Sequence, residues 1–123
     1  MISRLTNTGA VAAIALALVT GAAAAEPTAT DLETGKDIAM DRAKGNCIAC
    51  HVMEGGESPG NIGPPLVAMK ARYPEPDRLR AQIWDSTATN PNSAMPPFGK
   101  HEILTGKQVD QVVAFIQIGR ASC

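Results

Sequence analysis

The sequence predicts an all-α domain with long loops, and three observations support this fold class. Apolar residues recur at helical spacing in three segments, no segment of strand length alternates in polarity, and the segments are separated by stretches rich in glycine and proline. The chain has 123 residues, enough for one domain, and an aromatic content of only 3%. A chain this small, with so few large side chains, needs a bound group or a cross-link to complete its core.

The first predicted helix begins near Thr30, where Thr30 and Glu33 have the spacing of a capping box. Within this helix, Gly35, Ala39 and Ala43 recur every four residues and form a stripe of small side chains. Such a stripe lets a second helix approach closely, although an exposed alanine face is the simpler alternative in water.

Two further helices are predicted in the second half of the chain. One begins at Pro76, because proline is tolerated in the first turn of a helix, and it ends before Pro91. The other begins after a capping box of Thr105 and Gln108 and ends near Gly119. Its apolar face follows the spacing i, i+3, i+4 and i+7, with the residues Val109, Val112, Val113 and Ile116.

The first 25 residues have the pattern of a secretory signal peptide. Arg4 is the one charged residue before Glu26, an apolar, alanine-rich run follows it, and an A-x-A cleavage motif ends at Ala25. The run is shorter than the roughly 20 residues that cross a bilayer, which disfavours an uncleaved anchor. We therefore expect residues 1–25 to be removed, leaving residues 26–123 as a domain in a bacterial periplasm with no membrane span.

The charge balance and the cysteine content exclude two classes of protein. The chain has 11 Lys and Arg against 12 Asp and Glu, which is not the basic surplus of a nucleic-acid-binding protein. Its three cysteines, Cys47, Cys50 and Cys123, cannot form a closed set of disulfides. At least one cysteine must therefore have another role.

The segment Cys47-Ile48-Ala49-Cys50-His51 has the C-x-x-C-H pattern of covalent c-type haem attachment. Each thiol adds across one vinyl group of the haem to form a thioether, and the adjacent histidine turns its imidazole toward the iron. Haem also supplies the large apolar body that this sequence lacks. One covalently attached haem c per chain is therefore the predicted cofactor.

Three other interpretations of this segment fit less well. A thioredoxin-like C-x-x-C would lie beside a βαβ pattern, and the sequence has none. A zinc site needs four ligands, and Cys47, Cys50, His51 and the distant His101 match no common zinc spacing. A simple disulfide between the two cysteines would leave the adjacent histidine and the missing core unexplained.

The second axial position of the iron has five candidate ligands. They are Met40, Met53, Met69, Met95 and His101. Met40 on the first helix and Met69 on a possible short helix are expected to pack in the core. Met53 lies two residues beyond His51, which is too close in sequence to reach the opposite face of the haem.

Met95 is the predicted partner of His51. Met95-Pro96-Pro97 lies in a loop between the second and third helices, and the prolines limit the freedom of that loop. His101 is the competitor, since imidazole binds iron more strongly than a thioether, but it lies outside the proline segment and is expected on the surface. A His/Met pair raises the reduction potential relative to two histidines, which suits an electron acceptor.

One further contact is predicted around the axial histidine. A metal-ligating histidine usually donates its other N–H to a carbonyl or carboxylate. In Gly63-Pro64-Pro65-Leu66, the Pro64 carbonyl is the predicted acceptor, with a simple turn as the alternative. Phe115 could pack near the haem edge, but an ordinary core position is the simpler expectation.

Together these motifs resemble the class I cytochromes c, which fold as a small helical domain around one covalently bound haem. The resemblance rests on the C-x-x-C-H segment, on Gly63-Pro64-x-Leu66, on a later methionine and on an aromatic residue in the last helix. Residues 61–66, 79–85 and 95–105 further resemble the SoxX family, the haem subunits of the sulfur-oxidation (Sox) system.

The SoxX resemblance implies a function that the motifs alone do not. SoxX-like cytochromes pair with a SoxA-like haem subunit, and together they oxidatively couple thiosulfate to a cysteine of a SoxYZ-like carrier protein. This is an L-cysteine S-thiosulfotransferase reaction, in which the SoxX-like haem accepts electrons and passes them to a soluble cytochrome c. The resemblance therefore implies no catalytic residue in this chain, and it carries over Cys47 and Cys50 as haem attachments and His51 and Met95 as iron ligands.

Other functions and one residue stay open at the level of sequence. A free-standing periplasmic electron shuttle for another oxidoreductase would share the same fold and ligands. A haem-based sensor or peroxidase would need an open iron position. Cys123 is expected to form a disulfide with the partner subunit, with a frayed, dispensable terminus as the alternative.

Overall fold

The computed structural model describes residues 25–118. Cys123 and the predicted signal peptide, apart from Ala25, lie outside these residues. Within them the elements follow the order α1 (Ala29–Met40), η1 (Cys47–Ala49), α2 (Met69–Arg72), α3 (Pro76–Trp84), η2 (Ser86–Ala88) and α4 (Gly106–Ile118). The described residues contain no strand, which confirms the all-α prediction.

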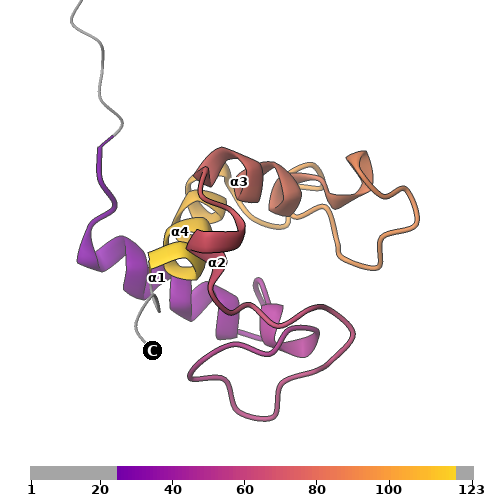
Figure 1. Cartoon of the computed structure of the whole chain (residues 1–123), viewed down its shortest axis with the longest axis horizontal. Coiled ribbons are helices and arrows are strands. Elements are labelled where there is room, and N and C mark those ends of the chain that lie inside the picture. The colour runs from indigo at the N-terminus through magenta and orange to yellow at the C-terminus, as the bar shows by residue number, and fades with distance from the viewer. Residues whose placement is uncertain (1–24, 119–123) are drawn as a thin grey trace, which may run out of the picture.

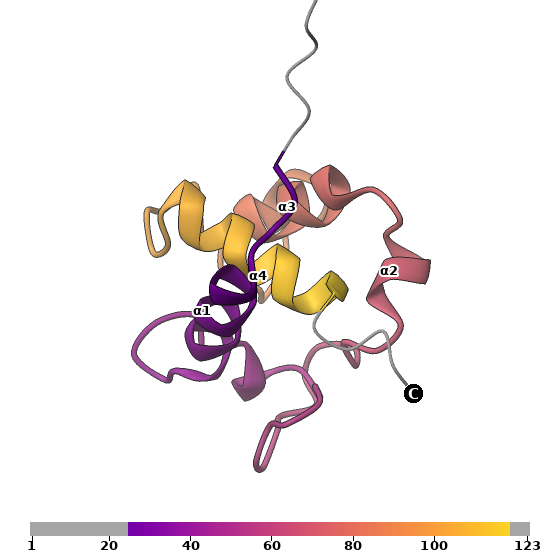
Figure 2. The ribbon, with the colours of Figure 1, turned by 90° about the vertical axis from the view of Figure 1, so that its left-hand side faces the viewer.

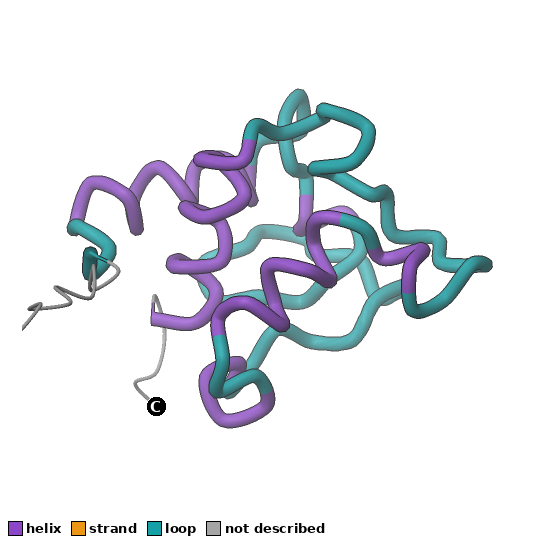
Figure 3. The backbone as a smooth tube through the Cα atoms, turned by 90° about the horizontal axis from the view of Figure 1, so that it is seen from above, coloured by secondary structure: helices purple, strands orange, loops and turns teal. Residues whose placement is uncertain are grey.

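The helices gather on one side of the molecule and the long loops form the other side (Figures 1 and 3). α1 and α4 cross and make the most extensive packing contact in the fold, and α3 packs against α4 (Figure 2). None of the helices within residues 25–118 is long and apolar enough to span a membrane.

α3 and α4 begin where the sequence predicts. Pro76 occupies the first turn of α3, which ends at Trp84. At α4, the Thr105 backbone N–H donates to Gln108 Oε1 at 2.9 Å, and the Gln108 N–H donates to Thr105 Oγ1 at 3.2 Å. These reciprocal bonds satisfy two of the donors that a helix start leaves free. The predicted capping box is confirmed.

α1 begins at Ala29, so the prediction of Thr30 as the capping residue was wrong. Thr28 caps the helix instead: its Oγ1 accepts from the Asp31 N–H at 3.1 Å, and the Asp31 carboxylate accepts from the Thr28 N–H at 3.1 Å. Thr28 and Asp31 have the same spacing as Thr30 and Glu33, so the local pattern does not distinguish the two boxes. A contact from α4 does: Gln111 Nε2 donates to Asp31 Oδ1 at 3.0 Å.

The Asp31 contacts predict a stability change in acid. Hydrogen bonds from Thr28 and then from Gln111 lower the Asp31 pKa from 3.8 to about 2. Because the folded-state pKa lies below the unfolded value, the stabilisation is complete above about pH 4 and is lost as the pH falls toward 2. In thermal unfolding between these pH values, Asp31→Asn is expected to give a shallower fall in Tm than wild type. Asp37→Asn on the same helix is the control, and equal slopes for all three proteins would contradict the assignment.

The small-residue stripe of α1 lies at the crossing with α4. Gly35 and Ala39 are both buried there. A Cβ on Gly35 would lie 2.0 Å from the Gln111 carbonyl oxygen and 3.0 Å from the Phe115 Cβ, so only glycine permits this approach. Ala43 lies beyond the end of the helix and is exposed, so the predicted stripe was wrong at its third position.

Gly35→Ala is expected to destabilise the protein by about 3 kcal/mol, because the obstacle is backbone rather than a flexible side chain and the two helices must separate. Gly106→Ala is the matched control, since a Cβ there comes no closer than 3.5 Å to the Arg80 guanidinium. Denaturant unfolding of the haem-loaded variants measures both. A free energy of unfolding for Gly35→Ala within about 0.5 kcal/mol of the control would contradict this packing account.

Candidate haem site

A cavity of about 720 Å³ lies between the C-x-x-C-H segment and the loop that precedes α4. Its volume is in the range of small-molecule and cofactor pockets. Every site residue predicted from the sequence is part of its lining, namely Cys47, Cys50, His51, Pro64 and Met95. These five residues, which are up to 48 positions apart in the sequence, are thus brought to one cavity.

The attachment segment is a single tight turn. The backbone N–H groups of Cys50 and His51 both donate to the Cys47 carbonyl, at 3.2 and 2.9 Å. No disulfide joins Cys47 and Cys50, so both sulfurs are available for thioether bonds to haem. Burial raises the pKa of the Cys47 thiol to about 11. Before haem attachment, this thiol is therefore protonated at neutral pH.

A backbone carbonyl from another segment of the chain orients the imidazole of His51. His51 Nδ1 lies 2.7 Å from the Pro64 carbonyl oxygen, the contact that the sequence leads us to expect. A carbonyl only accepts hydrogen bonds, so Nδ1 must carry the proton, and Nε2 keeps its lone pair for a metal. The ligation of iron itself stays a prediction.

Gly63 lies against the His51 ring, a position that no motif in the sequence indicates. A Cβ at this position would lie 2.4 Å from Cε1 and 2.6 Å from Nδ1 of His51. Any side chain would therefore push the imidazole away from the Pro64 carbonyl. The adjacency of Gly63 to the predicted acceptor was the signal in the sequence that could have identified it.

Met95 reaches the cavity from a loop held at the end of α3. Met95 is partly buried and packs against the main core cluster. Beyond it, the Phe98 N–H donates to the Ile83 carbonyl at 3.2 Å, and the Gly99 N–H donates to the Trp84 carbonyl at 3.2 Å. These bonds attach the loop to the last turn of α3.

The other candidate ligands have other surroundings. Met53 is buried with Ala39 and Phe115 in a second core cluster, and neither Met53 nor Phe115 lines the cavity. Met69 does line the cavity, but it lies in the core and its sulfur accepts a hydrogen bond from Arg72 Nη1 at 3.4 Å. His101 is exposed and lies outside the lining.

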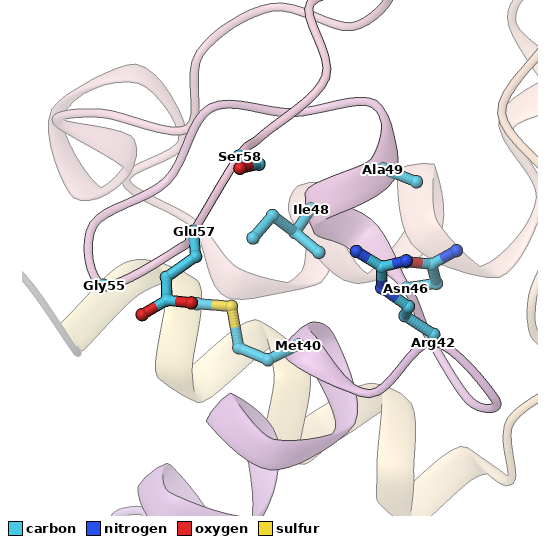
Figure 4. A pocket seen from close by; sticks show the side chains of 8 residues that line it. All are labelled: Met40, Arg42, Asn46, Ile48, Ala49, Gly55, Glu57 and Ser58. Atoms are coloured by element: carbon cyan, nitrogen blue, oxygen red, sulfur yellow. The ribbon is translucent and has the colours of Figure 1, made fainter.

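Met40 and Glu57 both line a second pocket of about 510 Å³ (Figure 4). The two pockets share part of their walls through Arg42, Asn46 and Ala49, but Met40 lines only the second pocket. Its predicted role in packing agrees with its contact with the second core cluster.

The lining of the larger cavity fits haem c in its chemistry. Two thiols, an imidazole and two thioethers lie among mainly apolar side chains. The lining also includes three basic side chains and no acidic one. They are Arg42, Lys44 and Arg72. This positive surplus complements the carboxylates that haem carries.

The fold and the site define a class I cytochrome c. Residues 30–116 match the family described as cytochrome C oxidase, cbb3-type, subunit III. Because this range is most of the chain, the protein belongs to that family of cytochrome c domains.

Two further similarities come from individual proteins. The chain is similar to a chain in the crystal structure of SoxXA from P. pantotrophus, with a TM-score of 0.63 and 29% identity. The match covers 70% of this chain and 79% of that chain. The chain is also 34% identical over 74 residues to an uncharacterized lipoprotein of Aquifex aeolicus (strain VF5), a match that covers 59% of this chain and 36% of that protein. It thus spans about a third of the length of that curated relative.

These findings confirm the predicted fold class, the resemblance and the cofactor. The chain is a SoxX-like class I cytochrome c, a haem protein of electron transfer whose haem c is covalently bound. The assignment of individual residues to the haem and its iron stays a prediction.

Proposed function

We propose that this protein is the electron-accepting haem subunit of a periplasmic complex that couples thiosulfate to a cysteine of a carrier protein. The observation that carries the proposal is the similarity to a chain of SoxXA, at 29% identity over 70% of the protein. Its partner would be a SoxA-like haem subunit, and its substrate protein a SoxYZ-like carrier. The chain would be part of an enzyme without being catalytic alone.

The chemistry of the coupling needs an electron acceptor. Joining thiosulfate to a thiol forms a sulfur–sulfur bond and releases one proton and two electrons. A bound haem c takes up and gives back one electron at a time. The chain therefore has to hand electrons onward, and a soluble cytochrome c is the proposed acceptor.

The residues of the cavity have two proposed roles, attachment of the haem and ligation of its iron. Cys47 and Cys50 hold the haem through thioethers, which prevents its loss from an exported protein. His51, oriented by the Pro64 carbonyl, and Met95 are the proposed axial ligands. With these two side chains as iron ligands, the haem would transfer electrons without binding substrate at its iron, and the thioether would favour the reduced state.

Export and partner attachment are part of the same proposal. Residues 1–25 would be removed as a signal peptide, leaving residues 26–123 in the periplasm. Cys123 would form a disulfide with the partner subunit in that oxidising compartment. Electrophoresis of the native complex with and without reductant tests the disulfide, and identical mobility in both lanes would contradict it.

Purification of the protein from its native periplasm tests the function. We expect a second haem subunit to copurify, and thiosulfate plus the carrier protein to reduce the haem of this chain. A carrier whose cysteine has been alkylated is the control and should give no reduction. A stable monomer that thiosulfate and carrier do not reduce would contradict the proposal and favour a free-standing electron shuttle.

A further inference from the structure

Ser86 is a completely buried hydroxyl that bonds to the backbone of Met95. It is the first residue of η2, directly after the corner that ends α3, and its exposed fraction is 0%. Its Oγ donates to the Met95 carbonyl oxygen at 2.6 Å. A buried hydroxyl has to be paired, and a hydrogen bond shielded from water is stronger than one on the surface. The hydrogen bond therefore connects the start of η2 to the loop that contains Met95.

The peptide groups of Met95 are held on both sides. On the amino side, the Met95 N–H donates to Ser93 Oγ at 3.2 Å, a local bond within the loop. On the carbonyl side, the bond from Ser86 spans nine residues of sequence. Pro96 follows with a fixed φ and no N–H of its own. The backbone of Met95 therefore has little freedom to rotate.

The segment that directly precedes Ser86 is itself held by several contacts. Gly99 lies against the Trp84 ring, where a Cβ would come within 2.0 Å of Cε3. Lys100 Nζ lies 2.8 Å from Asp85 Oδ2, and the Lys100 N–H donates to the Trp84 carbonyl at 3.1 Å. Contacts from Gly99 and Lys100 therefore hold the end of α3, directly before Ser86, in place.

We propose that Ser86 is a positioning residue for the axial methionine. Its hydroxyl holds the Met95 backbone so that the sulfur stays at the iron position and resists replacement by another ligand. A ligand whose backbone is already ordered loses less conformational freedom on binding, so the bond is more stable. This inference rests on the proposed ligation by Met95. Ser86 acts through that residue and does not itself line the cavity.

Imidazole competition on the haem-loaded protein tests the proposal. Imidazole is added to the ferric protein, and displacement of the thioether is followed in the visible spectrum. Ser86→Ala is expected to bind imidazole roughly tenfold more tightly, as expected from the loss of one buried hydrogen bond. Its reduction potential should also fall, because the thioether holds the reduced iron less firmly.

Thr89→Val is the matched control. Thr89 Oγ1 bonds to Gln82 Oε1 at 3.2 Å and to the Ser86 carbonyl at 3.3 Å, so this variant removes a hydroxyl from the same corner without touching Met95. We expect its imidazole affinity to stay within about twofold of wild type. Ser86→Cys keeps the shape and a weaker donor, so its affinity should be intermediate. It is the test variant if Ser86→Ala does not fold.

Two outcomes would overturn the inference, for different reasons. If Ser86→Ala or Ser86→Cys binds imidazole as wild type does, while Met95→Ala loses the iron–thioether absorption band, Met95 is the ligand and Ser86 does not position it. If Met95→Ala keeps the wild-type spectrum, the ligation itself is wrong and the role of Ser86 falls with it. Neither outcome bears on reduction by thiosulfate, so the proposed function is judged separately.

Discussion

Replacing both Cys47 and Cys50 with serine is expected to abolish covalent haem attachment and to leave the chain without a stable fold. The cavity of about 720 Å³ is far larger than the space left when one core side chain is truncated, a change that costs about 2–5 kcal/mol. Losing the group that fills it is therefore comparable with the whole stability of a small domain, about 5–15 kcal/mol. Haem staining of a denaturing gel and circular dichroism measure the two effects.

Matched variants separate attachment from folding. Cys50→Ser alone keeps one thioether site and should retain some covalent haem, whereas Cys123→Ser should attach haem as wild type does. A double variant that lacks haem and still gives the helical spectrum and thermal unfolding of wild type would contradict this role of the haem in the fold.

Met95→Ala is expected to have the second largest effect. The ferric protein should lose its iron–thioether absorption band, and its reduction potential should fall by about 0.1 V or more, within the range of ~0.8 V that axial ligands govern. The physical reason is the loss of a soft ligand that stabilises reduced iron. Visible spectroscopy and a redox titration of the purified protein measure the two changes.

His101→Ala is the control for this variant. His101 is exposed and lies outside the cavity lining, so its removal should change neither the spectrum nor the potential. If His101→Ala removes the sixth ligand and Met95→Ala does not, the axial assignment is reversed. If neither does, the sixth ligand is neither residue, and a spectrum typical of an open iron position would favour a sensor or peroxidase.

The helices could be predicted from the sequence wherever the signal was local. The proline at the start of α3 and the reciprocal bonds of Thr105 and Gln108 depend on neighbouring residues alone. The start of α1 could not be predicted in this way, because two threonine–acid pairs share one spacing. The Asp31 pair forms the cap, and its carboxylate is also held by Gln111, 80 residues away.

The site residues, too, could be predicted only where the signal was local. The C-x-x-C-H segment is a local pattern, and the Pro64 contact follows from what a ligating histidine needs. Gly63 and Ser86 were missed because their importance comes from where the folded chain places them. Gly63 lies against the His51 ring, and Ser86 bonds to a carbonyl nine residues on. No periodicity or motif in the sequence marks a serine for that role.

The intact mass of the purified wild-type protein shows whether one haem, bound through Cys47 and Cys50, forms the interior of this fold. With the proposed removal of residues 1–25, we expect a mass equal to residues 26–123 plus one haem, with the added mass on the tryptic peptide of residues 45–70. A mass equal to the bare chain, from material whose circular dichroism shows an ordered helical protein, would contradict it.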